Sequence, residues 1–184
     1  EARPERYTEA GLSEVPTRGG LAVTVPGCVH AWETLHRRFG RIAWPDLFAP
    51  AIHCARDGWP VSERTHRQIE RAAQSGEFSD AWRAVFAKQL PERPGGLYRI
   101  PAAARALEAI AAGGAAAFYR GEIARAIVTA VRAEGGVLTL DDLAGHATEE
   151  VAPLKLAHRG CDVYQTPPNS QGLVALVALY LYDR

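Results

Sequence analysis

The segment Leu173–Tyr182 constrains the fold of this chain more than any other part of the sequence. It consists of leucine, valine, alanine and tyrosine, so a helix formed here is apolar on nearly every face. A helix without a polar face is stable only where other elements cover it. We therefore expect a buried helix, and we expect the chain to end inside a larger assembly.

The composition is that of a soluble globular protein. With 47% apolar and 23% charged residues, it excludes a disordered tail and a collagen-like fibre. The 184 residues are enough for a substantial core, since typical domains have ~100–150 residues. The 21 basic and 21 acidic residues cancel, so no net field favours nucleic acid or an anionic membrane as a partner.

The two ends of the sequence suggest an origin in a longer polypeptide. The chain contains no Met, begins at Glu1 and stops at Arg184, directly after an apolar run. We interpret it as a fragment or as one chain of a processed protein. No signal peptide is visible, and we leave the compartment open while favouring the cytoplasm over export.

We treat 1–184 as a single partial domain whose first region is irregular. Proline and glycine punctuate residues 1–27, which predicts loops with one short strand candidate at Leu21–Val25. Residues 28–148 instead have helical periodicity interrupted by glycines, which predicts a helical region. Its first helix should place Val29, Trp32, His36 and Phe39 near one face.

The apolar period changes after residue 148. Residues 149–184 begin with two segments of extended character, which predicts a β-hairpin around Arg159-Gly160 and then the buried helix. Ser62 and Thr139 have the residue type and position of helix N-caps within the preceding helical region. The expected class is α+β, rich in helix.

Cysteine and histidine spacing predicts neither a metal site nor a cofactor. Cys28, Cys54 and Cys161 are an odd number without a CxxC pair. Buried free thiols are the favoured interpretation, with one disulfide or a metal as alternatives. The sequence also lacks the glycine-rich phosphate loops, the GxSxG elbow and the HExxH motif.

Few residues suggest catalysis by themselves. The pairs Asp141-Asp142 and Glu149-Glu150 are interpreted as capping and solvated groups rather than as an acid–base pair. Ser170 follows Pro167-Pro168 and could be a nucleophile, but helix capping explains it as well. The backbone N–H groups at that helix start could also bind an anion. By motif alone, the chain is not demonstrably an enzyme.

An ordered set of short motifs resembles the γ-glutamyltransferase family. In that family a glycine-rich strand ends in VPG and leads into a helix that contains Trp. The matching segments are Gly20–Gly27, Trp32, Gly40, Pro50-Ala51-Ile52, Pro60-Val61-Ser62, Leu107–Gly121, Gly135-Gly136, Leu138-Thr139, Asp142-Leu143, Pro153-Leu154, Arg159-Gly160, Val163-Tyr164 and Pro167-Pro168. Each piece is weak, but together they follow the family's order over about 20–184.

The resemblance implies an N-terminal-nucleophile hydrolase with a four-layer α/β/β/α sandwich, of which this chain is a helix-rich large-subunit part. Such a precursor cuts itself, and the nucleophile is the Thr exposed at the small subunit's new N-terminus. Its own α-amine can act as the base. Because Thr148 has the signs of an ordinary loop residue, we predict no catalytic residue in this chain. The implied partner is the small subunit, in a heterodimer or a dimer of heterodimers.

The resemblance also implies one substrate contact. The family's large subunit supplies an Arg, upstream of the VPG strand, that binds the glutamyl α-carboxylate through paired hydrogen bonds. Arg3, within Glu1-Ala2-Arg3-Pro4, is an approximate match, and Arg18 is the second candidate.

Two departures from the family pattern affect the substrate. The usual PPPSSGG-type segment is here Pro167–Gly172, and Ala31 stands where a Gly usually precedes the Trp. The first departure is similar to the acylase-like and hydrolytic branch of the family. Cleavage of γ-glutamyl amides is therefore the first functional hypothesis. A specialised acylase or biosynthetic hydrolase with a non-glutamyl substrate, or a non-catalytic relative, are the alternatives.

Overall fold

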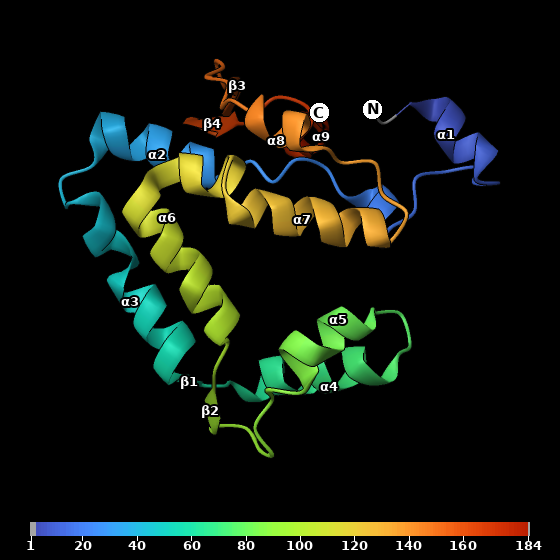
Figure 1. Cartoon of the computed structure of the whole chain (residues 1–184). Helices are drawn as coiled ribbons and strands as arrows, with labels where there is room; N and C mark the ends of the chain where they lie inside the picture. Colours follow the sequence, from blue (N-terminus) through green and yellow to red (C-terminus); the bar gives the residue numbers. More distant parts are fainter. Residues whose placement is uncertain (1–2, 184) are drawn as a thin grey trace. The chain divides into compact units, whose positions relative to one another are not determined.

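The computed structural model describes residues 3–183, which fall into two compact units, 3–147 and 148–183. Each is described by itself. The boundary between them lies one residue from the boundary predicted at 149, although the expectation of a single partial domain stays a prediction. Helices dominate the N-terminal unit, and the C-terminal unit consists of a hairpin and one helix (Figure 1).

The elements of the N-terminal unit follow one another with short connections. They are α1 (Pro4–Glu9), the 3-10 turn η1 (Gly20–Ala22), α2 (Cys28–Phe39), α3 (Trp44–Asp57), β1 (Trp59–Pro60), α4 (Glu63–Gln74), α5 (Asp80–Trp82), the π-helical turn η2 (Arg83–Ala87), β2 (Leu97–Tyr98), α6 (Pro101–Tyr119), α7 (Glu122–Ala133) and α8 (Leu140–Ala144). The predicted N-caps are confirmed: Ser62 accepts a hydrogen bond from the Thr65 amide, and Thr139 forms a capping box with Asp142.

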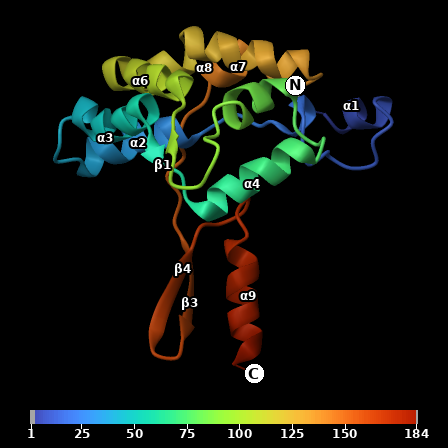
Figure 2. The ribbon, with the colours of Figure 1, turned by 90° about the horizontal axis from the view of Figure 1, so that it is seen from below.

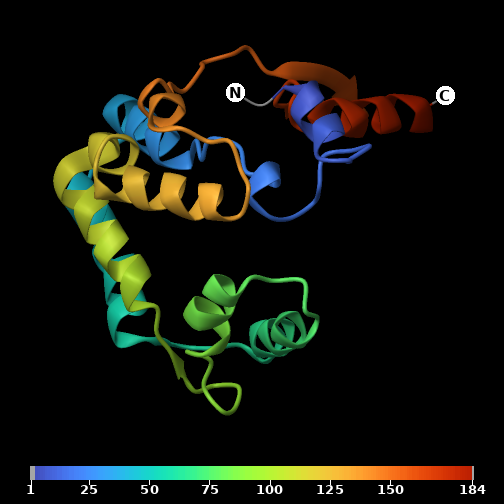
Figure 3. The ribbon, with the colours of Figure 1, turned by 45° about the vertical axis from the view of Figure 1, so that its right-hand side comes forward.

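The main core of this unit lies where α2, α3, α6, α7 and α8 meet. α3 and α6 run side by side along their length (Figure 3). The buried core residues are Val29, Phe48, Ile110, Ala111, Ala115, Tyr119, Ala124, Val131, Leu138 and Leu143. Three of these ten are alanine, and the other seven have large aliphatic or aromatic side chains. Burial of apolar area is therefore the main stabilising contribution.

α6 changes direction at Gly113-Gly114, one of the places where glycines interrupt the helical period of the sequence. Gly114 has φ +63° and ψ −160°, and the helix resumes to Tyr119. The Ala115 amide, which the break leaves without a helical partner, donates to Glu33 Oε1 at 3.0 Å. Glu33 also pairs with Arg37 at 2.9 Å on α2. A carboxylate of one helix thus caps the second half of another.

Residues 59–98 form an appendage whose two ends meet. β1 and β2 pair antiparallel, with Trp59 opposite Tyr98. Val61 and Tyr98 are fully buried within it, and the Tyr98 hydroxyl donates to the Phe86 carbonyl at 2.9 Å. The two-residue strands lie inside the region predicted to be helical.

The C-terminal unit is a hairpin packed against a helix. β3 (Leu154–His158) pairs antiparallel with β4 (Cys161–Gln165) around Arg159-Gly160, as predicted. Both turn residues have positive φ, the geometry of a tight two-residue hairpin turn. α9 (Gly172–Tyr182) lies alongside the two strands (Figure 2).

Three expectations were wrong. Residues 1–27 are not wholly irregular, since they contain α1 and η1, and Leu21–Val25 forms no strand because it pairs with no other strand among residues 3–183. The cysteines are exposed free thiols rather than buried ones.

α9 is only partly covered by its own unit, and its burial in a larger assembly stays a prediction. Leu176 is 6% exposed, but Val174 is 61% and Leu181 64% exposed. The reason is geometric, because a two-stranded hairpin can cover only one side of a helix. Throughout residues 3–183, every helix is too short or too polar to cross a bilayer.

Candidate functional site

The VPG segment is fixed by a buried tyrosine. The Tyr119 hydroxyl donates to the Pro26 carbonyl at 2.6 Å and accepts from the His30 amide at 3.3 Å. Burial raises the pKa of Tyr119, although the His30 amide partly opposes this rise. Tyr119 therefore acts as a neutral hydrogen-bonding group that ties the end of α6 to the start of α2.

Two histidines complete this group, which we call the Pro26 cluster: Pro26, Gly27, His30, Tyr119 and His146. The His146 ring stacks on Tyr119 at 5.2 Å between centroids and meets the His30 ring edge-on at 5.7 Å. A Cβ at Gly27 would lie 3.2 Å from the His146 ring, so the glycine admits the imidazole. Within residues 3–183, His146 Nε2 is buried without a hydrogen-bond partner.

The Gly19-Gly20 pair of the motif allows a close backbone approach. Gly20 packs directly on the end of α7, where a Cβ would collide with the Val131 carbonyl and lie 2.6 Å from the Gly136 amide nitrogen. Gly19 has φ +83°, which disfavours any residue with a side chain. The Gly135-Gly136 motif is therefore the structural partner of Gly19-Gly20. Both motifs are explained by packing rather than by a ligand.

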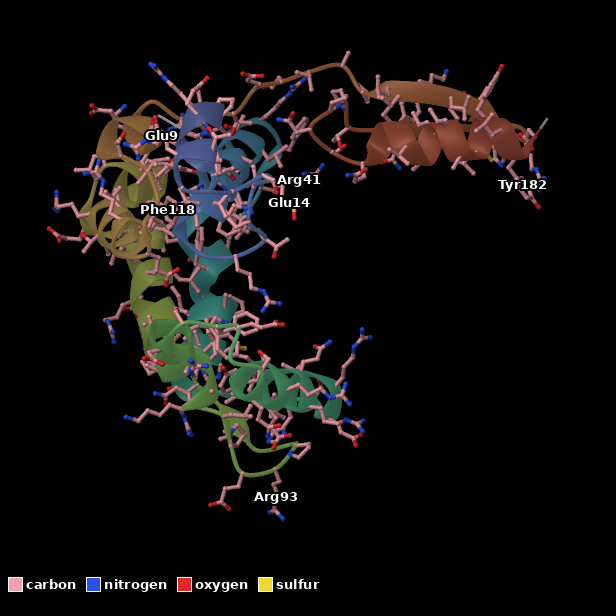
Figure 4. The ribbon with its side chains drawn as sticks, turned by 90° about the vertical axis from the view of Figure 1, so that its right-hand side faces the viewer. Glu9, Glu14, Arg41, Arg93, Phe118 and Tyr182 are labelled. Carbon is pink, nitrogen blue, oxygen red and sulfur yellow. The ribbon has the colours of Figure 1, made fainter. Side chains whose placement is uncertain are left out.

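Arg3, the predicted substrate contact, lies at the N-cap of α1. Its side chain is exposed and lines an open hollow of about 410 Å³ together with Glu5, Arg6 and Glu9. Glu9 is labelled on α1 in Figure 4. The two carboxylates beside the guanidinium would repel an anionic substrate group. The substrate-binding role of Arg3 stays a prediction.

Arg18, the second candidate, is held in an ion pair. Its guanidinium bonds the Glu77 carboxylate and lies over the Phe78 ring, 4.4 Å from the centroid. A carboxylate ligand would have to displace Glu77. The role of Arg18 stays a prediction too.

The residues considered for catalysis have structural contacts. Ser170 Oγ donates to the Thr166 carbonyl at 2.8 Å and accepts from the Gly172 amide at 3.2 Å, so it closes the turn that precedes α9, whose N-cap is Gln171. Asp142 accepts from the Thr139 amide and hydroxyl, and these bonds lower the pKa of its carboxyl. The Thr34 hydroxyl, 3.3 Å from His30 Nδ1, donates to the His30 carbonyl instead.

Two surface features were missed by the sequence analysis. An apolar hollow of about 710 Å³ lies between α2 and α3 and is lined mainly by apolar side chains, among them Trp32, Leu35, Phe39, Ile42 and Leu47. Trp32, His36 and Phe39 of α2 line this hollow together, as their predicted common face implies, and Phe39 is 65% exposed there. The second feature is a row of arginines on α4. No group of three His, Cys, Asp or Glu side chains among residues 3–183 has the arrangement of metal ligands.

Comparison with known proteins gives one consistent result. The family model described as gamma-glutamyltranspeptidase matches residues 1–184. The glutathione hydrolase-like YwrD proenzyme of Bacillus subtilis is 35% identical over 179 residues, which are 94% of this chain and 33% of that protein. The oxamate amidohydrolase proenzyme of Klebsiella pneumoniae is 36% identical in an alignment of 185 positions. This alignment covers 95% of this chain and 34% of that protein.

Solved structures agree. The cephalosporin acylase of Bacillus halodurans has a TM-score of 0.88 and 35% identity, covering 97% of this chain and 35% of that one. The gamma-glutamyltranspeptidase of Pseudomonas nitroreducens has a TM-score of 0.74 and 32% identity, covering 86% of this chain and 46% of that one. The chain thus spans about a third of the length of the curated relatives named here.

Proposed function

Because the chain belongs to the γ-glutamyltranspeptidase family, we propose that it is the large-subunit part of an enzyme that cleaves γ-glutamyl amides. The observation that carries this proposal is the family match over all of residues 1–184. Relatives named proenzymes that are three times as long support a partner chain cut from the same precursor.

The proposed reaction uses a threonine at the N-terminus of the partner small subunit. Its hydroxyl oxygen attacks the amide carbonyl carbon while its α-amine accepts the hydroxyl proton. The carbon–nitrogen bond breaks, the amine leaves with that proton, and an ester to the threonine remains. Water then releases the acid, or an acceptor amine releases a new amide.

This chain contributes scaffold and one binding residue to the proposed reaction. The Pro26 cluster holds the VPG segment at the start of α2 through the Tyr119–Pro26 hydrogen bond. We assign Arg3 as the group that pairs with the α-carboxylate of a glutamyl substrate. A guanidinium suits this role because it can form two parallel bonds to a carboxylate.

The test uses the whole protein. Mass spectrometry first determines whether the small subunit begins with Thr after self-cleavage, and γ-glutamyl-p-nitroanilide hydrolysis is then measured. Arg3→Ala should raise KM for this substrate with kcat nearly unchanged, and Arg6→Ala on the same helix is the matched control. An uncleaved, inactive protein would reject the mechanism. Equal KM values for the two variants would reject the substrate-binding role of Arg3 and leave the mechanism standing.

A second candidate is an acylase or amidohydrolase with a non-glutamyl substrate. The similarity to the cephalosporin acylase, with the higher of the two TM-scores, supports it. The carboxylates of Glu5 and Glu9 beside Arg3 also disfavour an anionic substrate. Comparing kcat/KM for γ-glutamyl amides with that for neutral acyl amides separates the two, since the second candidate requires a preference for the neutral amides.

A further inference from the structure

One face of α4 carries a row of arginines. Residues 64, 67, 68 and 71 are spaced by three and four positions, so they lie on the same side of the helix. Arg64, Arg67, Gln68 and Arg71 line a shallow hollow of about 350 Å³. All four are exposed, whereas His66 on the opposite side is buried.

The acidic residues of α4 neutralise only Arg67 of the three arginines on this face. Glu63 pairs with Arg67 at 3.1 Å, and Glu70 pairs with the buried His66 at 3.2 Å. The side chains of Arg64 and Arg71 form neither an ion pair nor a hydrogen bond with any group in residues 3–183. Arginines elsewhere are frequently paired, as Arg56 is with Glu108 and Arg125 with Glu122.

The position of Arg64 has an energetic cost in the free chain. It lies in the first turn of α4, where the positive end of the helix dipole disfavours a cation. Like charges three and four residues apart on a helix are also destabilising. A bound anion would offset both effects.

The spacing of the arginines indicates the kind of anion. Arg64 and Arg71 are separated by two helical turns, about 10.5 Å along the axis, so the row can pair with two carboxylates spaced along one ligand at the same time. Gln68 lies between them, and its amide both donates and accepts hydrogen bonds. A peptide backbone offers both complementary groups, whereas a chain of phosphates offers mainly acceptors.

We propose that this face of α4 binds an acidic peptide segment of a partner protein. Two carboxylates of the segment pair with Arg64 and Arg71, and Gln68 bonds the backbone between them. A membrane surface is a weaker fit, because the apolar side of α4, with Ile69 and Ala72, is turned toward the protein and is half-buried.

The experiment measures fluorescence anisotropy of a labelled peptide with glutamates at every third position, added to the whole purified protein at low salt. In a peptide with polyproline II conformation, which has three residues per turn, this spacing places the carboxylates on one side about 9 Å apart. The variant is Arg64→Ala/Arg71→Ala. The matched control is Arg93→Ala/Arg105→Ala, which removes the same charge from two other exposed arginines. Inorganic phosphate and phosphatidylserine vesicles are tested in parallel.

The expected result is binding that weakens about fivefold or more in the α4 variant and less than twofold in the control. Gln68→Ala should weaken binding without changing its salt dependence. Equal losses in the two double variants would overturn the proposal as general electrostatic attraction. Failure of the wild type to bind the peptide, or tighter binding to the vesicles through the same arginines, would overturn it too. None of these outcomes depends on amide hydrolysis.

Discussion

At the scale of single residues, Tyr119 makes the most consequential contact of the candidate site. Its hydroxyl is the side-chain donor to the Pro26 carbonyl within residues 3–183. Tyr119→Phe leaves that carbonyl and the His30 amide without this partner, and should lower the free energy of unfolding by about 1–3 kcal/mol. Urea denaturation measures the loss. Tyr164→Phe, at an exposed tyrosine, is the control, and an equal loss there would contradict the assignment.

Gly20 offers a second test at this scale. Gly20→Ala adds a methyl group that collides with backbone atoms of Val131 and Gly136, and backbone cannot move aside cheaply. We expect a loss of about 1–3 kcal/mol from overpacking, measured by thermal unfolding. Gly76→Ala is the comparison, because it has positive φ but open space around the new methyl group. A smaller loss at Gly20 than at Gly76 would show that the contact can relax.

At the scale of elements, the kink of α6 depends on a single carboxylate. Glu33→Ala should uncap the half-helix that begins at Ala115, whereas Glu33→Gln keeps an acceptor oxygen. Hydrogen exchange of the Ala115 amide should accelerate strongly in the alanine variant and only slightly in the glutamine variant. Unchanged exchange in both would mean that Glu33 does not hold the kink.

The start of α8 should be sensitive to acid. The bonds from Thr139 hold the pKa of the Asp142 carboxyl below its ordinary value in the folded state. Their contribution to stability is thus present above the unfolded pKa and is lost as the pH falls through the folded pKa. Thr139→Ala should remove that part of the pH dependence. Denaturation at pH 6 and at pH 3 measures it, and a variant that keeps the full acid sensitivity of the wild type would refute the role of Asp142.

Elements were predictable where a local signal determines them. The hairpin turn at Arg159-Gly160 and the caps at Ser62 and Thr139 depend on neighbouring residues, and the sequence located all three. Leu21–Val25 has strand composition, but a strand requires a partner, which no local pattern reveals. The β1–β2 pair is too short to have a period.

The candidate site was less predictable, because its contacts join distant parts of the chain. Arg18 meets Glu77 across 59 residues, and Tyr119 meets Pro26 across 93. Spacing within a motif contains no information about such pairs. The family resemblance identified the segments that come together but not the bonds between them.

For the whole molecule, the exposed apolar surface predicts poor solubility of this chain by itself. Most of the apolar side chains of α9 face solvent, and the hollow between α2 and α3 exposes several more. Burying each of these side chains contributes ~1.5–3 kcal/mol, so the chain should associate strongly with any surface that covers them. We expect residues 1–184 expressed alone to aggregate and co-expression with the small subunit to prevent it. A soluble monomer with a sharp melt would reject this.

Substitutions in α9 separate association from folding. Val174→Ser/Leu181→Ser removes exposed apolar area, and should reduce aggregation of the isolated chain while weakening its binding to the small subunit. Leu176→Ser instead removes the contact with the hairpin and should loosen the C-terminal unit itself. Light scattering and circular dichroism give the two readouts. Equal aggregation of the first variant and the wild type would contradict the role of the exposed face.

The adjacent ends of the appendage make residues 59–98 resemble an insertion into a helical hairpin. The chain leaves α3 and returns to α6 at neighbouring points, where the Ile100 amide donates to the Ala55 carbonyl at 2.9 Å. Replacing these residues by a four-residue linker would shorten the loop about tenfold. The entropic free-energy cost of closing the loop would fall by about 2 kcal/mol. A lineage could therefore gain or lose this segment in one genetic event, with α3 and α6 still paired.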